Sequence, residues 1–74
     1  MAIPIKERPT GKRYLGNSSY TKMEVHDLLN EQTNCQIDEI IKARHAVVFE
    51  PDMLGQVSRE GYDNCAYCLG HSMR

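Results

Sequence analysis

Residues 21–44 read TKMEVHDLLNEQTNCQIDEIIKAR, and this stretch carries the strongest local signals for secondary structure in the chain. Thr21 and Glu24 have the spacing of a capping box, in which both side chains accept hydrogen bonds from backbone N–H groups at a helix start. The apolar residues that follow recur at i, i+3 and i+4, the spacing of one helix face: Val25, Leu28 and Leu29. We therefore predict a first helix that begins at Thr21.

A second capping box, Thr33-x-x-Gln36, follows the polar residues 30–32. Behind it, isoleucines again recur at helical spacing, with Arg44 at the end of the same face: Ile37, Ile40 and Ile41. Two capped helices joined by a few polar residues make a helix-turn-helix pair. Residues 20–74 are therefore predicted to form a small, mainly α, helix-turn-helix domain.

The flanking segments are less regular. Residues 1–19 are rich in proline and glycine and have little apolar periodicity, so we predict a disordered, flexible arm. Residues 45–49 form a β-prone apolar run that ends at the turn signal Glu50-Pro51-Asp52, and residues 55–58 can return as a second strand. This hairpin is one option; the other is that the second helix continues to Phe49.

Charge is distributed unevenly along the chain, although the net charge is only −1. The arm is basic and residues 21–52 are acidic, a pattern typical of a protein that contacts a charged partner. A solvated tail and a solvated acidic face are the simpler alternative. We predict that the partner-binding residues are Lys6, Arg8, Lys12, Arg13, Tyr14, Asp38 and Glu39. The basic arm could also contact nucleic acid.

No apolar run is long enough to span a bilayer, and the first residues lack the apolar stretch of a signal peptide. We therefore expect a cytoplasmic monomer with no membrane association. The three cysteines agree with this expectation, because stable disulfides are uncommon inside cells.

The last twelve residues contain Cys65-x-x-Cys68-x-x-His71. Two cysteines at this spacing commonly bind one zinc ion, which takes four ligands in a tetrahedron. Cys35 is the natural fourth ligand, and His45 or His26 are substitutes for it. One structural zinc held by Cys35, Cys65, Cys68 and His71 would stabilise so small a core. Buried or free thiols and thiol redox chemistry remain as alternatives.

The stretch from Tyr20 to Ile41, followed by the β-prone run, resembles the start of excisionase-type and winged helix-turn-helix proteins. The resemblance implies that the second helix enters the DNA major groove. In this sequence that helix carries Asp38 and Glu39 near the end that would face the bases, and phosphates repel carboxylates. We therefore expect a basic protein surface as partner, with a winged helix-turn-helix DNA-binding protein as the alternative.

The layout of a small acidic body, a basic arm and a cysteine cluster is also similar to that of small phage-encoded regulators that bind host RNA polymerase, such as the inhibitors and antiterminators of lytic Xanthomonas phages. This resemblance implies a non-enzymatic transcription regulator whose partner is an RNA polymerase subunit in the host cytoplasm. A third function class comes from Glu60, Cys65, Cys68 and His71, which resemble the alkylhydroperoxidase-type motif and imply a CxxC thiol redox protein.

Overall fold

The computed structural model describes residues 2–65 and residue 69, and within them the chain forms a five-stranded mixed sheet. In chain order the strands are β1 (Ala2–Pro4), β2 (Tyr14–Asn17), β3 (Glu24–Asp27), β4 (Ala46–Phe49) and β5 (Asp63–Asn64). Their order across the sheet is β1-β4-β2-β3-β5. All neighbours are antiparallel except β3 and β5, which run parallel. The first and last strands therefore form the two edges of the sheet.

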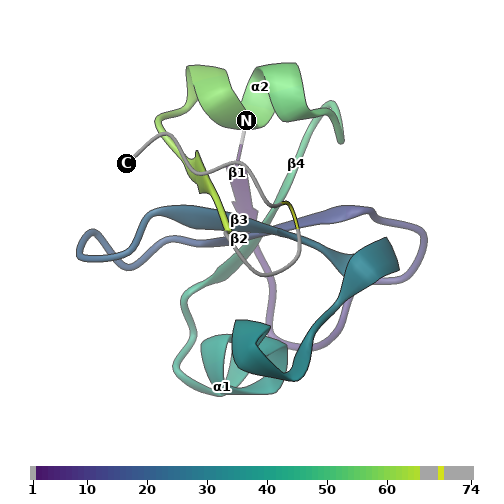
Figure 1. The fold of residues 1–74 in the computed structure, drawn as a ribbon, viewed down its shortest axis with the longest axis vertical. Coiled ribbons are helices and arrows are strands. Elements are labelled where there is room, and N and C mark those ends of the chain that lie inside the picture. Colours follow the sequence, from purple (N-terminus) through teal and green to yellow (C-terminus); the bar gives the residue numbers. More distant parts are fainter. Residues whose placement is uncertain (1, 66–68, 70–74) are drawn as a thin grey trace.

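Short helices cover the two opposite faces of this sheet (Figure 1). Helix α1 (Ile37–Lys42) lies on one face, preceded by the 3-10 helices η1 (Leu28–Asn30) and η2 (Thr33–Cys35). Helix α2 (Leu54–Arg59) lies on the other face. The architecture of the described residues is thus a small α/β domain in three layers.

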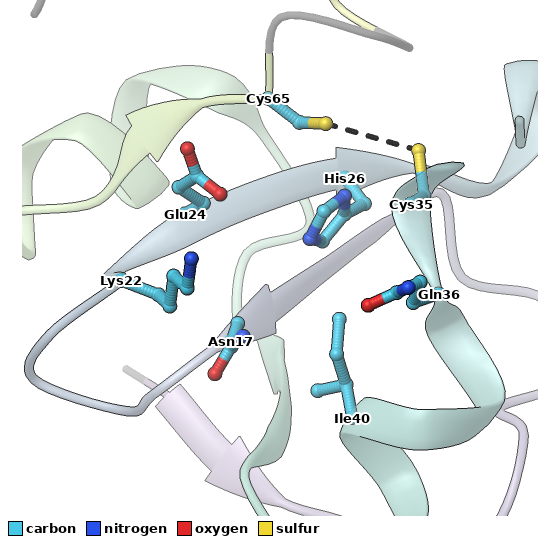
Figure 2. Close-up of a pocket in the computed structure, with 8 residues that line it drawn as sticks. All are labelled: Asn17, Lys22, Glu24, His26, Cys35, Gln36, Ile40 and Cys65. Carbon is cyan, nitrogen blue, oxygen red and sulfur yellow. Dashed lines mark hydrogen bonds between the residues drawn. The ribbon is translucent and has the colours of Figure 1, made fainter. Parts of the chain in front are cut away.

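The alternation of side chains along each strand divides the core between the two faces. Leu15 packs on the α1 face with Ile37 and Ile40, whereas its strand neighbour Tyr14 packs on the α2 face with Phe49 and Val57. The side chains of strand β3 alternate in the same way, because Val25 packs in the cluster on the α2 face. Its neighbour His26 is then directed to the α1 face, where Figure 2 draws it.

Gly16, in the central strand β2, is required by the close packing on the α2 face. A Cβ atom at this position would lie 2.7 Å from Cζ of Phe49, 2.9 Å from Cγ2 of Val47 and 3.0 Å from Cε2 of Tyr62. The rings of Phe49 and Tyr62 meet edge to face above it, with centroids 5.1 Å apart. Any side chain at position 16 would displace this aromatic pair.

The prediction of a mainly α, helix-turn-helix domain is wrong, because the described residues form a five-stranded mixed sheet with two short α-helices. The predicted first helix is strand β3 followed by η1. Met23, inside the predicted helix, has a φ of 45° and ends the hairpin turn between β2 and β3. Leu29, which the helical pattern assigns to the core, is 76% exposed.

The prediction of a disordered N-terminal arm is also wrong. Residues 1–19 contribute the edge strand β1 and the central strand β2. Strand β2 bonds to both β3 and β4, and Leu15 within it is fully buried. The arm predicted from the prolines and glycines is therefore part of the sheet.

The second half of the sequence agrees with the structure in part. The β-prone run corresponds to β4, and the second predicted helix corresponds to α1, although α1 begins at Ile37. Gln36, which was predicted to lie inside the capping box, has a φ of 54° and separates η2 from α1. The predicted return strand over residues 55–58 is wrong, because these residues lie in α2.

Of the helices in residues 2–65, none has both the length and the apolar character needed to cross a lipid bilayer.

Candidate metal centre

Three buried side chains with metal-binding atoms converge on the α1 face of the sheet: His26, Cys35 and Cys65. His26 belongs to β3, Cys35 is the last residue of η2, and Cys65 directly follows β5. His26 and Cys65 are 39 positions apart in the chain, so tertiary structure alone brings the three residues together. Figure 2 shows the sulfur atoms of Cys35 and Cys65 directed toward one another, with the ring of His26 nearby.

Backbone pairing places Cys65 beside β3. The register of the parallel pair aligns Val25 with Asn64, and the backbone N–H of Cys65 donates to the carbonyl oxygen of Val25 at 2.9 Å. Because a parallel ladder fixes the neighbour of each residue, Cys65 lies next to His26 rather than farther along the strand. The backbone N–H of Leu69 in turn donates to the carbonyl oxygen of Cys65 at 2.9 Å.

Cys35 is positioned by a turn between two helices. Its backbone N–H donates to the carbonyl oxygen of Gln32, and that of Gln36 donates to Thr33. The left-handed conformation of Gln36 then redirects the chain into α1, whose Ile37 and Ile40 are buried against the sheet. The sulfur of Cys35 is thereby held in the core, with the residue 4% exposed.

The geometry of the cluster is compact. The candidate ligand atoms all lie within 4.8 Å of one another, and the two Sγ atoms are 3.8 Å apart. His26 and Cys65 are 4% and 3% exposed. The three side chains therefore lie close enough to bind one metal ion.

The electrostatic environment of His26 favours the form that binds metals. Burial lowers the pKa of the imidazole below its ordinary value of 6.5, and the negative charge of Glu31 offsets only part of this shift. At neutral pH the ring is therefore uncharged, with a lone pair available on one nitrogen.

The residue types and the sulfur separation both fit zinc. Thiolate sulfur and imidazole nitrogen are the usual zinc ligands, with Zn–S distances of about 2.3 Å. Two sulfurs at that distance from the centre of a regular tetrahedron are separated by about 3.8 Å, since the tetrahedral edge is roughly 1.6 times the bond length. The separation of 3.8 Å between Cys35 and Cys65 is compatible with this edge, and it is also the distance of an ordinary contact between two thiols.

A partly open cavity of about 140 Å³ adjoins the cluster. Its walls mix polar side chains from the β2–β3 hairpin with the ligand candidates and the start of α1. The lining residues are Asn17, Lys22, Glu24, His26, Cys35, Gln36, Ile40 and Cys65. Figure 2 shows Glu24 and Lys22 on one side of the lining residues and Cys35 and Gln36 on the other.

The predicted zinc ligands have different outcomes. The structure brings Cys35 and Cys65 together, whereas Cys68 and His71 lie outside the described residues. Of the two substitute histidines, His26 is in the cluster and His45 is an exposed residue between α1 and β4. In the predicted first helix, His26 is a surface or boundary residue beside Val25. The signal that could have found it is the alternation in β3, which buries Val25 on one face and His26 on the other.

Most of the predicted partner-binding residues make polar or charged contacts within the molecule. The guanidinium of Arg8 donates two hydrogen bonds to the carboxylate of Glu31, at 2.8 and 2.9 Å, and one to Asp38 at 2.8 Å. The bonds from Arg8 lower the pKa of the Glu31 carboxyl. Charges that the sequence separates into a basic arm and an acidic body therefore neutralise one another here.

Contacts within the molecule also involve Lys12, Arg13 and Tyr14. Lys12 pairs with Glu50, and the guanidinium of Arg13 pairs with the buried carboxylate of Asp27 at 3.2 Å. The same guanidinium lies over the ring of Tyr14, 5.1 Å from its centroid. Glu39 is exposed near the N-terminal end of α1.

Comparisons of the chain with protein-family models, with curated protein sequences and with solved structures found no match.

Proposed function

We propose that this chain is a small, non-enzymatic zinc-binding domain in which His26, Cys35 and Cys65 hold one structural Zn²⁺. The observation that carries the proposal is the convergence of three buried ligand atoms within 4.8 Å of one another. Bound zinc would neutralise the two thiolates and supply tetrahedral bonds between β3, η2 and the segment after β5. A chain of this size has a small core, so such bonds would contribute much of its stability.

Cys68 is our candidate for the fourth ligand. It follows Cys65 at the Cys-x-x-Cys spacing, which lets both thiolates reach one ion. Its sequence neighbour Leu69 packs on the core, and the N–H of Leu69 bonds to Cys65. His71 is the alternative fourth ligand from the sequence.

Cobalt substitution tests the ligand set directly. Co²⁺ replaces Zn²⁺ in tetrahedral sites, and its visible absorption reports the geometry and the number of thiolate ligands. The proposal predicts a tetrahedral spectrum with thiolate-to-metal charge transfer that is reduced in Cys35→Ser and in Cys65→Ser. An octahedral spectrum that is the same in the parent chain and in both variants would contradict it.

A protein partner from the transcription machinery stays a prediction. What supports it is a surface depression of about 420 Å³ beside α1, whose acidic side chains a basic partner would bind in competition with Arg8; it is lined by Glu31, Thr33, Gln36, Ile37, Asp38 and Glu39. Such a surface complements a basic partner, and its contribution to the association rate would weaken with salt. The zinc site would then act as support for η2 and α1, which present this surface.

Thiol redox chemistry is the second candidate function, and the separation of 3.8 Å between the sulfurs of Cys35 and Cys65 favours it. Small rotations of the two side chains could bring this pair to disulfide distance, about 2.05 Å. Zinc binding and disulfide formation are mutually exclusive at these sulfurs. The cobalt experiment therefore separates the two, because a disulfide has no thiolate to offer the metal.

A further inference from the structure

A second pocket, distinct from the metal cluster, is lined by three cations and one apolar side chain. Lys6, Ile41, Lys42 and Arg44 surround a volume of about 190 Å³. Lys6 follows the edge strand β1, Lys42 is the last residue of α1, and Arg44 lies in the turn before β4. We refer to these four residues as the basic pocket. It shares no lining residue with the cavity beside the cysteines.

Among the residues that the structure describes, no carboxylate forms an ion pair with the cations of the basic pocket, Lys6, Lys42 and Arg44. No carboxylate is among its lining residues. The other cations of the N-terminal segment differ in this respect, because Arg8, Lys12 and Arg13 each pair with a carboxylate. Three like charges around one depression repel each other unless an anion lies between them.

The backbone of Arg44 gives an independent indication that its side chain is used. Arg44 has a φ of 64° directly after the end of α1, a left-handed conformation that helices most often fill with glycine. A residue with a Cβ atom is strained there, and strained conformations of this kind cluster at ligand-binding sites. The helix dipole does not require a second cation at position 44, because Lys42 already supplies one in the last turn of α1.

We propose that the basic pocket binds the phosphate group of a small phosphate-bearing ligand. Arginine presents a planar fork of donors that matches phosphate oxygens, and lysine adds compact positive charge. Ile41 supplies an apolar wall that reduces competition from water. Asp38 and Glu39, on the same helix, disfavour the longer run of phosphates in nucleic acid, so the pocket suits one phosphate group rather than a polyanion. This proposal does not depend on the zinc site.

Titration with inorganic phosphate, followed by amide chemical shifts in a buffer without other multivalent anions, tests the proposal. We expect saturable shifts at residues 5–6 and 41–45, and no such shifts with sodium chloride at the same ionic strength. Arg44→Gly is the most informative variant, because glycine accepts the left-handed conformation. It should weaken phosphate binding about tenfold, the loss expected for a charged hydrogen bond, while the melting temperature stays the same or rises.

Lys42→Gln should also weaken binding, whereas Arg59→Gln, the equivalent last-turn change in α2, should leave it unchanged. Absence of saturable shifts would overturn the proposal, as would parental affinity in Arg44→Gly. A duplex DNA oligonucleotide serves as the second probe. Tighter binding of DNA than of phosphate, weakened by Arg44→Gly, would replace the single-phosphate site with a nucleic-acid contact. Folding of each variant is checked by its dispersed amide spectrum.

Discussion

The sulfur atoms of Cys35 and Cys65 lie 3.8 Å apart in the core, although 30 residues separate them in the chain. One belongs to η2 and the other follows the edge strand β5, so this contact connects the α1 layer to the segment that follows β5. His26 lies beside both sulfurs and connects them to the sheet. A metal ion at this point would therefore join three parts of the fold that local sequence does not connect.

Removal of zinc should destabilise the protein strongly. A free zinc concentration 1,000 times the dissociation constant adds about 4 kcal/mol to the free energy of unfolding. Each kcal/mol shifts the melting temperature of a domain this size by about 4–8 °C. A chelator should therefore lower the melting temperature by about 15 °C or more. In Cys35→Ser the melting temperature should already be low, and the chelator should cause no further drop. An equal chelator effect in parent and variant would show that the metal binds elsewhere.

The stability of the metal-free protein should decrease on mild acidification because of His26. Burial lowers the pKa of His26 in the folded state below the ordinary 6.5, so below that pH the unfolded state binds more protons than the folded state. This contribution is fully present above 6.5 and is lost as the pH falls through the lowered value. Urea unfolding between about pH 7 and pH 5 should show the decrease, and His26→Gln should make it shallower. An unchanged slope in that variant would exclude His26 as its source.

Oxidation of the metal-free protein should join Cys35 to Cys65. With hydrogen peroxide as the oxidant, the two thiols lose two protons and two electrons, one S–S bond forms, and the peroxide is reduced to two waters. Mass spectrometry of proteolytic fragments should find the peptides of Cys35 and Cys65 linked. Zinc added before the peroxide should protect them, because bound thiolates are less available. Linkage of Cys65 to Cys68 instead would contradict the prediction.

Gly16→Ala should destabilise the α2 face. The new methyl group would lie 2.7 Å from Cζ of Phe49 and 2.9 Å from Cγ2 of Val47, and both side chains are buried and have little room to move. Overpacking of this kind costs about 1–3 kcal/mol of unfolding free energy. Gly55→Ala is the matched control, because nothing lies within 4 Å of its added Cβ and alanine favours the α2 helix by about 0.5–1 kcal/mol. Chemical denaturation of the two variants should therefore give changes of opposite sign.

Arg8 and Asp38 should show a small favourable coupling in the isolated protein. Their side chains are 46% and 80% exposed, and exposed ion pairs are typically worth about 0.2–1 kcal/mol. A double-mutant cycle with Arg8→Gln and Asp38→Asn measures the coupling, which should shrink in high salt. A coupling of zero at low salt would show that the pair does not hold the N-terminal segment against α1. Asp38 would then be available to a partner, as the sequence predicted, while Arg8 would keep its two hydrogen bonds to Glu31.

Sequence patterns identified the elements whose signals are local and missed those made by distant pairing. Val47 and Val48 lie in a run that is β-prone by composition, and it is strand β4. Val25 lies in a segment with helical spacing, yet it is a strand because β2 and β5 bond to its two sides. The turn between β2 and β3 is stabilised by a local interaction, since the side chain of Asn17 accepts a hydrogen bond from the backbone N–H of Ser19. Which strands meet across the sheet depends on contacts that no short window contains.

The sequence predicted the chemistry of the candidate site but not all of the residues that form it. The Cys-x-x-Cys spacing and the distant Cys35 indicated a zinc site, and the structure places Cys35 beside Cys65. His26 could not be assigned to that site from a helical reading of residues 21–30, because a helix surface would direct it elsewhere. Likewise, the separation of charge between arm and body gave no sign that Arg8 would pair with Asp38.

Native mass spectrometry of the reduced protein decides whether His26, Cys35 and Cys65 bind zinc. After incubation with zinc and removal of the excess, we predict a mass that corresponds to the chain with one Zn²⁺. A chelator should remove the ion, and His26→Gln and Cys65→Ser should each show reduced occupancy, whereas His45→Gln should behave like the parent chain. A metal-free parent spectrum under these conditions, or full occupancy in both ligand variants, would contradict the claim.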